Sequence, residues 1–334
     1  MTPVPASILR ALSLPLDPSK STLHTSGLGS GFASTGRIRA SVPVLSDNGY
    51  SSEGEEERQY FVKTSSASGS EEMFRGEHAS LNAIASIVPG FCPRGLAWGT
   101  LDDDDDGEGG YFLVTEYLDL SGRGSSSSRG SSSSSSGTLA QRLGKLHSTP
   151  APALPGGQRG FGFPVATYCG DTRQANGFRA SWAAFYADER LRSIVAECER
   201  RNGSRDYGLR ELVERTATEV VPALLRDGHL GGGRAPITPV VVHGDLWSGN
   251  AARGRIVVVN AAAAAAAADA EEEIEVTGDV VYDPSACYAH SEYDLGIMRM
   301  FGGFGRAFFD EYHRVVPRTE PVDEYEDRVQ LYEL

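Results

Sequence analysis

The order of hydrophobic patterns along the 334-residue chain predicts an α+β fold, with paired strands in its first part and mainly helices in its second. Arg37 to Leu45 and Gln59 to Thr64 are β-rich runs separated by an acidic, polar stretch, as in a hairpin. Leu96 to Gly99 and Tyr111 to Tyr117 form a second such pair around an aspartate-rich loop. From about residue 138 onwards, apolar residues recur at the helical spacing instead.

One helix is predicted inside the strand-rich part, because apolar residues recur at helical spacing from Glu71 to Ile87. Glu77 lies in its middle, and Lys63 ends the apolar strand run before it. The two residues are either unrelated surface charges or a strand lysine held by a helix glutamate. Kinases use such a pair to hold the lysine against the α- and β-phosphates of ATP, and this pattern favours that interpretation.

The same patterns predict how the chain divides. We expect a first lobe over residues 1–120, a low-complexity Ser/Gly-rich insert over 121–137, and a second lobe over 138–334. Within the second lobe, helices are predicted over Thr138 to His147, Phe178 to Cys198 and Leu209 to Leu225.

Composition excludes several classes of protein. The formal net charge is −14, and its acids gather in stretches that look like loop insertions, without the basic stripe of a nucleic-acid surface. The longest apolar run, Ala261 to Ala268, is too short to span a bilayer, and no secretory signal pattern is present. The four cysteines are widely scattered, without metal-ligand spacing, as in a reduced cytosolic protein. We therefore expect a cytoplasmic protein with no nucleic-acid or membrane partner.

The chemistry is concentrated in HGDLWSGN, His243 to Asn250, and in a later YDP that contains Asp283. The spacing from Asp245 to Asn250 is that of the D-x-x-x-x-N catalytic loop of kinases. Phosphoryl transfer needs one aspartate for the substrate hydroxyl, with an Asn and a second Asp for magnesium. Asp245 is therefore predicted to be the catalytic base, and Asn250 and Asp283 to be the metal ligands. The alternative is a loop whose Asp and Asn only cap turns.

Two further segments fit nucleotide binding. The Gly/Ser-rich Ser26 to Gly36 is either a plain hairpin turn or a loop whose backbone N–H groups cover phosphates. The run YFLVTEYL reads as an inner strand, and in a kinase-like fold the backbone near Glu116 to Leu118 would bond adenine.

Taken together, these segments resemble the fructosamine kinase family, the ketosamine-3-kinases. The segments that carry the resemblance are FVK at Phe61 to Lys63, MFRGEHASLNAI at Met73 to Ile84, FGFPVATYCGDTRQANGF at Phe161 to Phe178, SWAAFYADERL at Ser181 to Leu191, HGDLWSGN at His243 to Asn250, and YDPSACYAHSEYDLGIMRMFGGF at Tyr282 to Phe304. The resemblance implies a protein-kinase-like bilobal fold. Its small N-lobe would hold an antiparallel sheet and one helix, and its larger C-lobe would be mainly helical.

The resemblance also implies an activity. Such proteins use ATP and Mg²⁺ to phosphorylate the 3-hydroxyl of a sugar joined to an amine, on small ketosamines or on lysines of glycated proteins. The 3-phosphate makes the adduct unstable, so the amine is regenerated and the protein is repaired. Family members are typically cytosolic, and some plant members are sent to plastids, which here would require a missing N-terminal extension. We expect a monomer or a weak dimer.

Site residues are carried over position by position. Asp245 is implied as the base, and Asn250 and Asp283 as the metal ligands. The residues implied to bind the nucleotide are Gly29, Ser30, Gly31, Lys63, Glu77, Glu116, Tyr117 and Leu118. Trp247 either stacks on the sugar or is core, and the candidates to shape the sugar site or brace the catalytic loop are His290, Glu292 and Asp294. For Asp294 the bracing role is favoured.

Two other functions stay open at this stage. The chain is either a phosphotransferase of the same fold acting on another small hydroxylated substrate, or an inactive kinase-fold binding protein. The second alternative arises because the chain stops at Leu334, inside a segment that continues into further helices in relatives, so we expect the C-lobe to be truncated.

Overall fold

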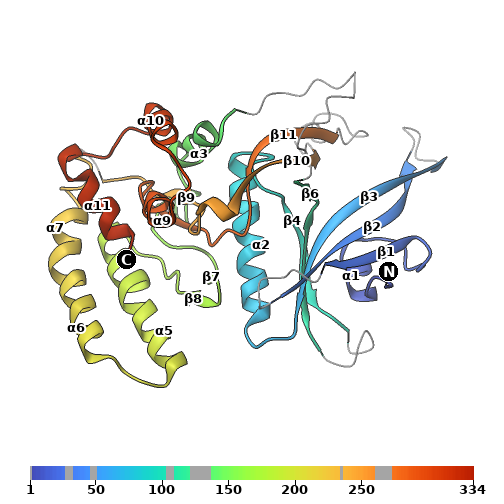
Figure 1. Cartoon of the computed structure of the whole chain (residues 1–334), viewed down its shortest axis with the longest axis horizontal. Helices are drawn as coiled ribbons and strands as arrows, with labels where there is room; N and C mark the ends of the chain where they lie inside the picture. The colour runs from blue at the N-terminus through green and yellow to red at the C-terminus, as the bar shows by residue number, and fades with distance from the viewer. Residues whose placement is uncertain are drawn as a thin grey trace. The chain divides into compact units, whose positions relative to one another are not determined.

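The computed structural model describes residues 2–26, 33–45, 51–102, 109–120, 137–233, 236–259 and 273–334 (Figure 1). The chain forms two compact units. The first comprises Met1–His78, Cys92–Ser136 and Arg253–Val280, and the second comprises Ala79–Phe91, Gly137–Ala252 and Val281–Leu334. Both units are therefore built from segments that are distant in sequence, and the simpler division near residues 120 and 138 stays a prediction.

A five-stranded antiparallel sheet forms the first unit, in the order β1–β2–β3–β5–β4. The strands are β1 (Ser21–Ser26), β2 (Ser34–Leu45), β3 (Ser51–Ser65), β4 (Gly95–Thr100) and β5 (Tyr111–Glu116). Both predicted strand pairs are confirmed, since β2 pairs with β3 and β4 with β5. Lys63 on β3 lies opposite Thr35 on β2 and Leu113 on β5, so it is on a central strand.

The hairpin of β2 and β3 extends further than the sequence predicts. Glu55, Glu56 and Glu57, expected in a polar loop, are paired residues of β3. Cross-strand charges offset the low strand propensity of glutamate. Glu55 contacts Lys20, and Arg39 Nε lies 3.8 Å from Glu57 Oε1.

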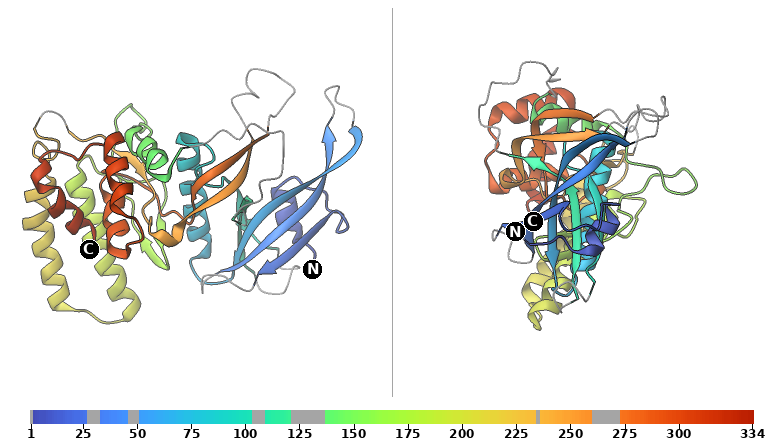
Figure 2. Two further views of the ribbon diagram at one scale, coloured as in Figure 1. Left: turned by 45° about the horizontal axis from the view of Figure 1, so that its top comes forward. Right: turned by 90° about the vertical axis from the view of Figure 1, so that its right-hand side faces the viewer.

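A short helix that the sequence did not reveal, α1 (Ala6–Ala11), covers one face of this sheet (Figure 2). Its Ile8 is fully buried and packs with Ile38, Val62 and Val114 from the strands. The helix has six residues, too few for a helical pattern to be recognised, and burial of its apolar side rather than intrinsic propensity holds it.

A second, three-stranded sheet of the first unit has the order β11–β10–β6. Its strands are β6 (Leu118–Asp119), β10 (Ala251–Val259) and β11 (Glu273–Val281). Ile256, Val276 and Val280 are buried in its core, with Leu118 packed against them. The hairpin of β10 and β11 ends just before Asp283.

Helix α2 (Ser70–Ile87) also has the predicted bounds within one residue, and its residues up to His78 belong to the first unit. Most of the second unit is helical. Its helices are α3 (Leu139–Ser148), α4 (Trp182–Phe185), the π-helical η2 (Tyr186–Arg192), α5 (Ser193–Asn202), α6 (Tyr207–Arg215), the π-helical η3 (Thr216–Val220), α7 (Val221–Leu225), α9 (Tyr293–Phe301), α10 (Arg306–Val315), η5 (Val322–Glu324) and α11 (Tyr325–Tyr332).

Local signals explain where two of these helices begin. Thr138 caps α3 by accepting from the Gln141 N–H, and the Gln141 side chain bonds back to the Thr138 N–H. The helix expected from Phe178 begins instead at Trp182, because Arg179 pairs with Phe161 in a β-bridge. Trp182 is fully buried, and its indole N–H donates to the Tyr332 hydroxyl over 2.8 Å.

Two small antiparallel pairs complete the second unit, β7 (Thr167–Cys169) with β8 (Thr172–Gln174) and β9 (Val240–Val242) with β12 (Cys287–Ala289). Among the residues that the structure describes, no helix has the length and apolar character needed to cross a bilayer.

Candidate active site

Lys63 and Glu77 form an ion pair inside the first unit. Lys63 Nζ lies 2.8 Å from Glu77 Oε1 and 3.0 Å from Oε2. The two side chains are only 13% and 14% exposed, so solvent screens their attraction weakly. Strand β3 supplies the lysine and α2 the glutamate, which excludes the alternative of two unrelated surface charges.

The stretch expected to bind adenine follows β5. Arg94 Nε lies 2.7 Å from Glu116 Oε1, and the Arg94 N–H donates to Oε2 over 2.8 Å. The Glu116 N–H in turn donates to the Arg94 carbonyl oxygen over 3.0 Å. These bonds fix the end of the strand, and they commit both the carboxylate and the amide of Glu116. Adenine binding by the backbone near Glu116 to Leu118 stays a prediction.

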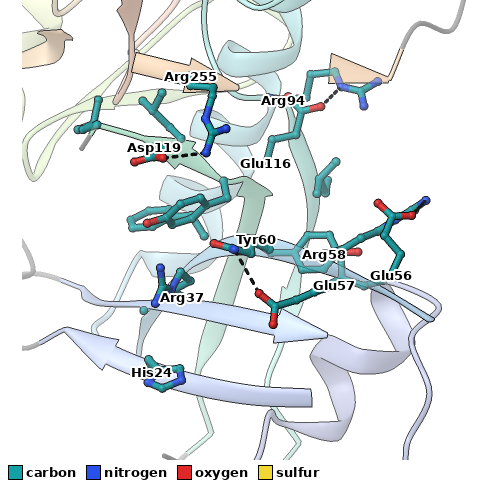
Figure 3. Close-up of a pocket in the computed structure, with 18 of the residues that line it drawn as sticks. His24, Arg37, Glu56, Glu57, Arg58, Tyr60, Arg94, Glu116, Asp119 and Arg255 are labelled. Atoms are coloured by element: carbon teal, nitrogen blue, oxygen red, sulfur yellow. Dashed lines mark hydrogen bonds and ion pairs between the residues drawn. The ribbon is translucent and has the colours of Figure 1, made fainter. Parts of the chain in front are cut away.

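A cavity of about 1100 Å³ lies in the first unit beside this stretch (Figure 3). Strands β1 to β3 contribute His24, Arg37 and Tyr60 to its wall. The Arg37 guanidinium lies over the Tyr117 ring, 5.6 Å from its centre, which is a cation–π distance. Neither Lys63 nor Glu77 is among the described residues that line it, so the cavity borders the Tyr117–Leu118 stretch and not the predicted phosphate contacts. Gly29, Ser30 and Gly31 of the predicted phosphate loop lie outside the described residues.

In the second unit, β9 runs directly into the predicted catalytic loop. Gly244 has a φ of 80°, and a Cβ there would lie 1.9 Å from the Ser285 carbonyl oxygen, so only glycine fits. Asp294 accepts hydrogen bonds of 2.7 Å from the N–H groups of His243 and Gly244. His147 Nε2 lies 3.1 Å from the same carboxylate. The predicted bracing role of Asp294 is thus confirmed.

Asp245 follows Gly244 and is held by two neighbours. Asn250 Nδ2 donates to the Asp245 carbonyl oxygen over 2.8 Å and to its Oδ2 over 3.2 Å. The Cys169 thiol donates to the same carboxylate. Burial raises the pKa of Asp245 from 3.8 to about 6, and these two hydrogen bonds oppose the rise. Burial also raises the pKa of Cys169 to about 12, with the nearby Asp245 charge adding to it.

Tyr282, the residue before Asp283, belongs to the same bonded network. The Tyr282 N–H donates to the Asn250 carbonyl oxygen over 3.1 Å, and the Tyr282 hydroxyl donates to the Gly249 carbonyl oxygen over 2.7 Å. Asp283 itself is exposed and has a left-handed φ of 55°. Such a backbone costs of order 1 kcal/mol for a residue other than glycine, and it is found most often at functional sites.

Asn250 and Asp283 suit a magnesium ion in chemical type. Because Asn250 Nδ2 is committed to Asp245, its Oδ1 is the atom left for a ligand role. Mg²⁺ prefers oxygen ligands and usually takes only one or two from protein, with water and phosphate oxygens filling the rest. Within the described residues, no cluster of three or more His, Cys, Asp or Glu side chains forms a dedicated protein cage for a metal.

Trp247 follows Asp245 on the loop and lies at the surface of the second unit. Its exposure is 38%, and its ring contacts Phe301, which is 61% exposed, at 5.9 Å between ring centres. A Cβ at Gly249 would lie 2.1 Å from the Trp247 ring, so glycine leaves the indole its place. The alternative of a core tryptophan is therefore wrong.

His290 and Glu292, by contrast, lie in the interior. Glu292 accepts from Arg328 Nε over 2.8 Å and from the Thr319 N–H over 2.7 Å. His290 bonds the Tyr332 hydroxyl over 2.9 Å and Thr319 Oγ1 over 2.8 Å. Both side chains are almost fully buried, and their polar atoms are committed to these partners. We therefore correct their assignment from sugar contact to bracing of the second unit.

The buried His290 makes stability dependent on pH. Burial lowers its pKa to about 4, against 6.5 in the unfolded chain. Between these values the unfolded chain binds the proton and the folded one does not, so stability falls as pH drops from 6.5 towards 4. The loss approaches about 3 kcal/mol. Urea unfolding at pH 7.5, 6 and 5 is expected to show a shallower decline for His290→Asn than for wild type; equal slopes would contradict this account.

Comparison with known proteins supports one family. A family model described as Fructosamine kinase matches residues 17–334. Ketosamine-3-kinase of Mus musculus is 31% identical over 284 residues, which cover 82% of this chain and 79% of that protein. A probable ketoamine kinase of Synechocystis sp. is 33% identical over 279 residues, 83% and 75% of the two chains. A chloroplastic protein-ribulosamine 3-kinase of Arabidopsis thaliana is 28% identical over 280 residues, 82% and 68%.

Solved structures show the same fold. A putative fructosamine-3-kinase from Haemophilus somnus has a TM-score of 0.62 at 19% identity, covering 98% of this chain and 86% of that one. One from Thermobifida fusca has a TM-score of 0.60 at 20% identity, covering 99% and 90%. The predicted α+β, kinase-like fold class is confirmed.

Proposed function

Because the chain belongs to the fructosamine kinase family, we propose that it transfers a phosphoryl group from ATP to the sugar 3-hydroxyl of ketosamines. The observation that carries the proposal is the connected network of the second unit. In it, Asp245 is bonded to Asn250, and Asn250 is bonded to the backbone of Tyr282, next to Asp283. These are the residue types that phosphoryl transfer needs, and the hydrogen bonds join Asp245 and Asn250 to the residue next to Asp283.

Asp245 accepts the proton of the attacking hydroxyl in this proposal. A general base works best when its pKa lies near the working pH, because it is then both unprotonated and basic. The Asp245 pKa of about 6 meets that condition near neutral pH. Asn250 holds the carboxylate in place through its amide nitrogen, and its backbone tie to Tyr282 restrains the segment that carries Asp283.

The nucleotide is held by charge. Lys63, oriented by Glu77, bonds the α- and β-phosphates, and Tyr117 and Leu118 border the adenine. Asn250 Oδ1 and the Asp283 carboxylate would hold Mg²⁺, which when bound neutralises charge on the phosphates. The phosphate loop with Gly29, Ser30 and Gly31 stays part of the proposal.

The acceptor class follows from the named relatives, a ketosamine-3-kinase and a protein-ribulosamine 3-kinase. We include ribulosamine and fructosamine adducts, both small and on protein lysines. Trp247 offers the sugar an exposed aromatic face. Phosphorylation destabilises the adduct and regenerates the amine, which makes the protein a repair enzyme. We place it in the cytoplasm, or in a plastid as for the relative named chloroplastic, as a monomer or weak dimer.

Product analysis tests the proposal. The chain is incubated with ATP, Mg²⁺ and ribulosyl-lysine or fructosyl-lysine, and the products are followed by mass spectrometry and phosphorus NMR. The expected result is one phosphate added to the sugar, followed by free lysine. Phosphate on another hydroxyl, or release of phosphate from ATP without a phosphorylated sugar, would overturn the proposal.

The lysine–glutamate pair gives a prediction on ATP use. Lys63→Met removes a positioned cation from the phosphates, so kcat/KM for ATP is expected to fall about 100-fold. Glu77→Gln keeps the size of the side chain and is expected to give a smaller fall in the same direction, because the lysine loses its charged partner. Lys20→Met, which changes a more exposed lysine of the same unit, is the control. Equal kinetics for Lys63→Met and Lys20→Met would contradict the role.

Trp247 gives a prediction on the acceptor. Trp247→Ala removes the aromatic face, so the KM for the ketosamine is expected to rise about tenfold while the KM for ATP stays unchanged. Tyr207→Ala, which removes a tyrosine that is 74% exposed on α6, is the matched control. A change in the KM for ATP instead would show that Trp247 contacts the nucleotide and not the acceptor.

A further inference from the structure

A second cavity, of about 490 Å³, lies within the second unit beside the catalytic loop. Gly244 and Cys169 are part of its wall. The Cys169 thiol donates to the Asp245 carboxylate, so the side chain of Cys169 joins the cavity wall to the proposed base. A substrate whose hydroxyl reaches Asp245 has this cavity next to it.

The cavity also contains a buried cation, Arg190, whose exposure is 3%. Its Nη1 donates to the carbonyl oxygens of Ala175 and Glu189 over 2.7 and 3.0 Å, and its Nη2 donates to Asn176 Oδ1 over 2.8 Å. The Cys287 thiol and the Tyr293 hydroxyl are further hydrogen-bond partners of this guanidinium. All of these partners are uncharged.

No carboxylate among the described residues forms an ion pair with Arg190, and its Nε has no hydrogen-bond partner there. The neighbouring Glu189 is engaged by Arg179 Nη2 at 2.7 Å instead. Asp294, which also lines the cavity, is committed to the His243 and Gly244 amides. A buried charge normally has an ionic partner, since burial without one is costly. The charge of Arg190 is therefore not balanced by a carboxylate among the described residues, and its Nε–H is the group left for a ligand.

The outer wall of the cavity is apolar. Ile194 and Val195 on α5 line it together with residues of α6 and α9. Leu209, Leu212 and Met300 contribute to it while being 45%, 59% and 50% exposed. Large exposed apolar side chains gathered around one cavity indicate a binding surface.

We propose that this cavity receives the amine part of the ketosamine and selects adducts of apolar α-amino acids. The α-carboxylate pairs with Arg190, and the amino-acid side chain packs on Ile194, Leu209 and Leu212. In an α-linked adduct, the carboxylate and the side chain sit on the carbon next to the amine, within reach of one small cavity. An adduct on the lysine ε-amine holds its carboxylate four methylene groups further away. The inference rests on the proposed ketosamine kinase activity and names a preference among its small substrates, beside the adducts on protein lysines.

Two matched substrates test it directly. Ribulosyl-leucine and ribulosyl-leucinamide differ only in the carboxylate, and kcat/KM is expected to be at least tenfold higher for the acid. Ribulosyl-glycine keeps the carboxylate without the apolar side chain, and its kcat/KM is expected to be lower than that of ribulosyl-leucine. Equal kcat/KM for the leucine and leucinamide adducts, with both phosphorylated, would overturn the inference and leave the proposed function standing. If no ketosamine at all is phosphorylated, the inference and the proposed function are both wrong.

Variants of the chain supply a second readout. Arg190→Gln is expected to abolish the preference for the acid while the leucinamide adduct is still phosphorylated; a preserved preference would overturn the pairing. Should that variant fail to fold, the wild-type substrate pair decides alone. Leu212→Asp is expected to lower kcat/KM for ribulosyl-leucine about tenfold. Val220→Asp is its control, since Val220 is 40% exposed and lies outside the cavity lining. Equal losses in these two variants would overturn the apolar contact.

Discussion

Asp245→Asn is expected to lower kcat about 1000-fold while the Kd for ATP stays within about twofold. Asparagine has nearly the shape of aspartate, but it cannot accept the proton of the sugar hydroxyl. The backbone bond from Asn250 Nδ2 to the residue 245 carbonyl oxygen is kept, so the loop stays folded. Steady-state kinetics with a ketosamine and a separate nucleotide titration measure the two quantities.

Asp323→Asn is the control for this experiment, because it removes a carboxylate on the surface of the same unit. It is expected to leave both quantities unchanged. A kcat for Asp245→Asn within tenfold of wild type would show that Asp245 is not the base. Loss of ATP binding together with turnover would instead point to a role in the nucleotide site.

Asp283→Asn is expected to weaken magnesium-dependent binding of ATP about 100-fold, because a neutral amide replaces the charged metal ligand. Asparagine is the informative replacement. It tolerates the left-handed backbone seen at φ 55°, so the loss is not one of conformation. ATP titrations with and without Mg²⁺ measure the effect. Wild-type protein treated with a chelator is expected to bind ATP as weakly as the variant.

Unchanged dependence on Mg²⁺ in Asp283→Asn would reject the ligand role. A drop in ATP affinity that persists without Mg²⁺ would assign Asp283 to direct contact with the nucleotide. Circular dichroism is expected to show the same secondary structure in wild type and in Asp283→Asn, which checks that the variant is folded.

Features set by local pattern were predictable. Strand alternation and helical spacing located β3 and α2, and with them the Lys63–Glu77 pair. The loop from His243 to Asn250 was recognisable because its spacing is itself the chemical motif. The bracing role of Asp294 was implied by the family resemblance rather than by a local pattern, and the structure confirms it.

Features set by packing between distant segments were not predictable. Cys169 looked like one of four scattered thiols, and only the fold brings it to Asp245. The burial of Arg190, in the segment SWAAFYADERL, was not predictable, since sequence does not show that a charge is buried. For His290 and Glu292 the sequence left a sugar contact and a bracing role open, because their partners Arg328 and Thr319 lie far along the chain.

The most direct test of the account is ATP consumption by the purified chain in the presence of ribulosyl-lysine and fructosyl-lysine, each compared with free lysine. We expect either adduct to stimulate ATP consumption, lysine to have no effect, and Asp245→Asn to remove the stimulation. ATP consumption that is the same with an adduct as with lysine, in a folded chain that binds ATP, would contradict it.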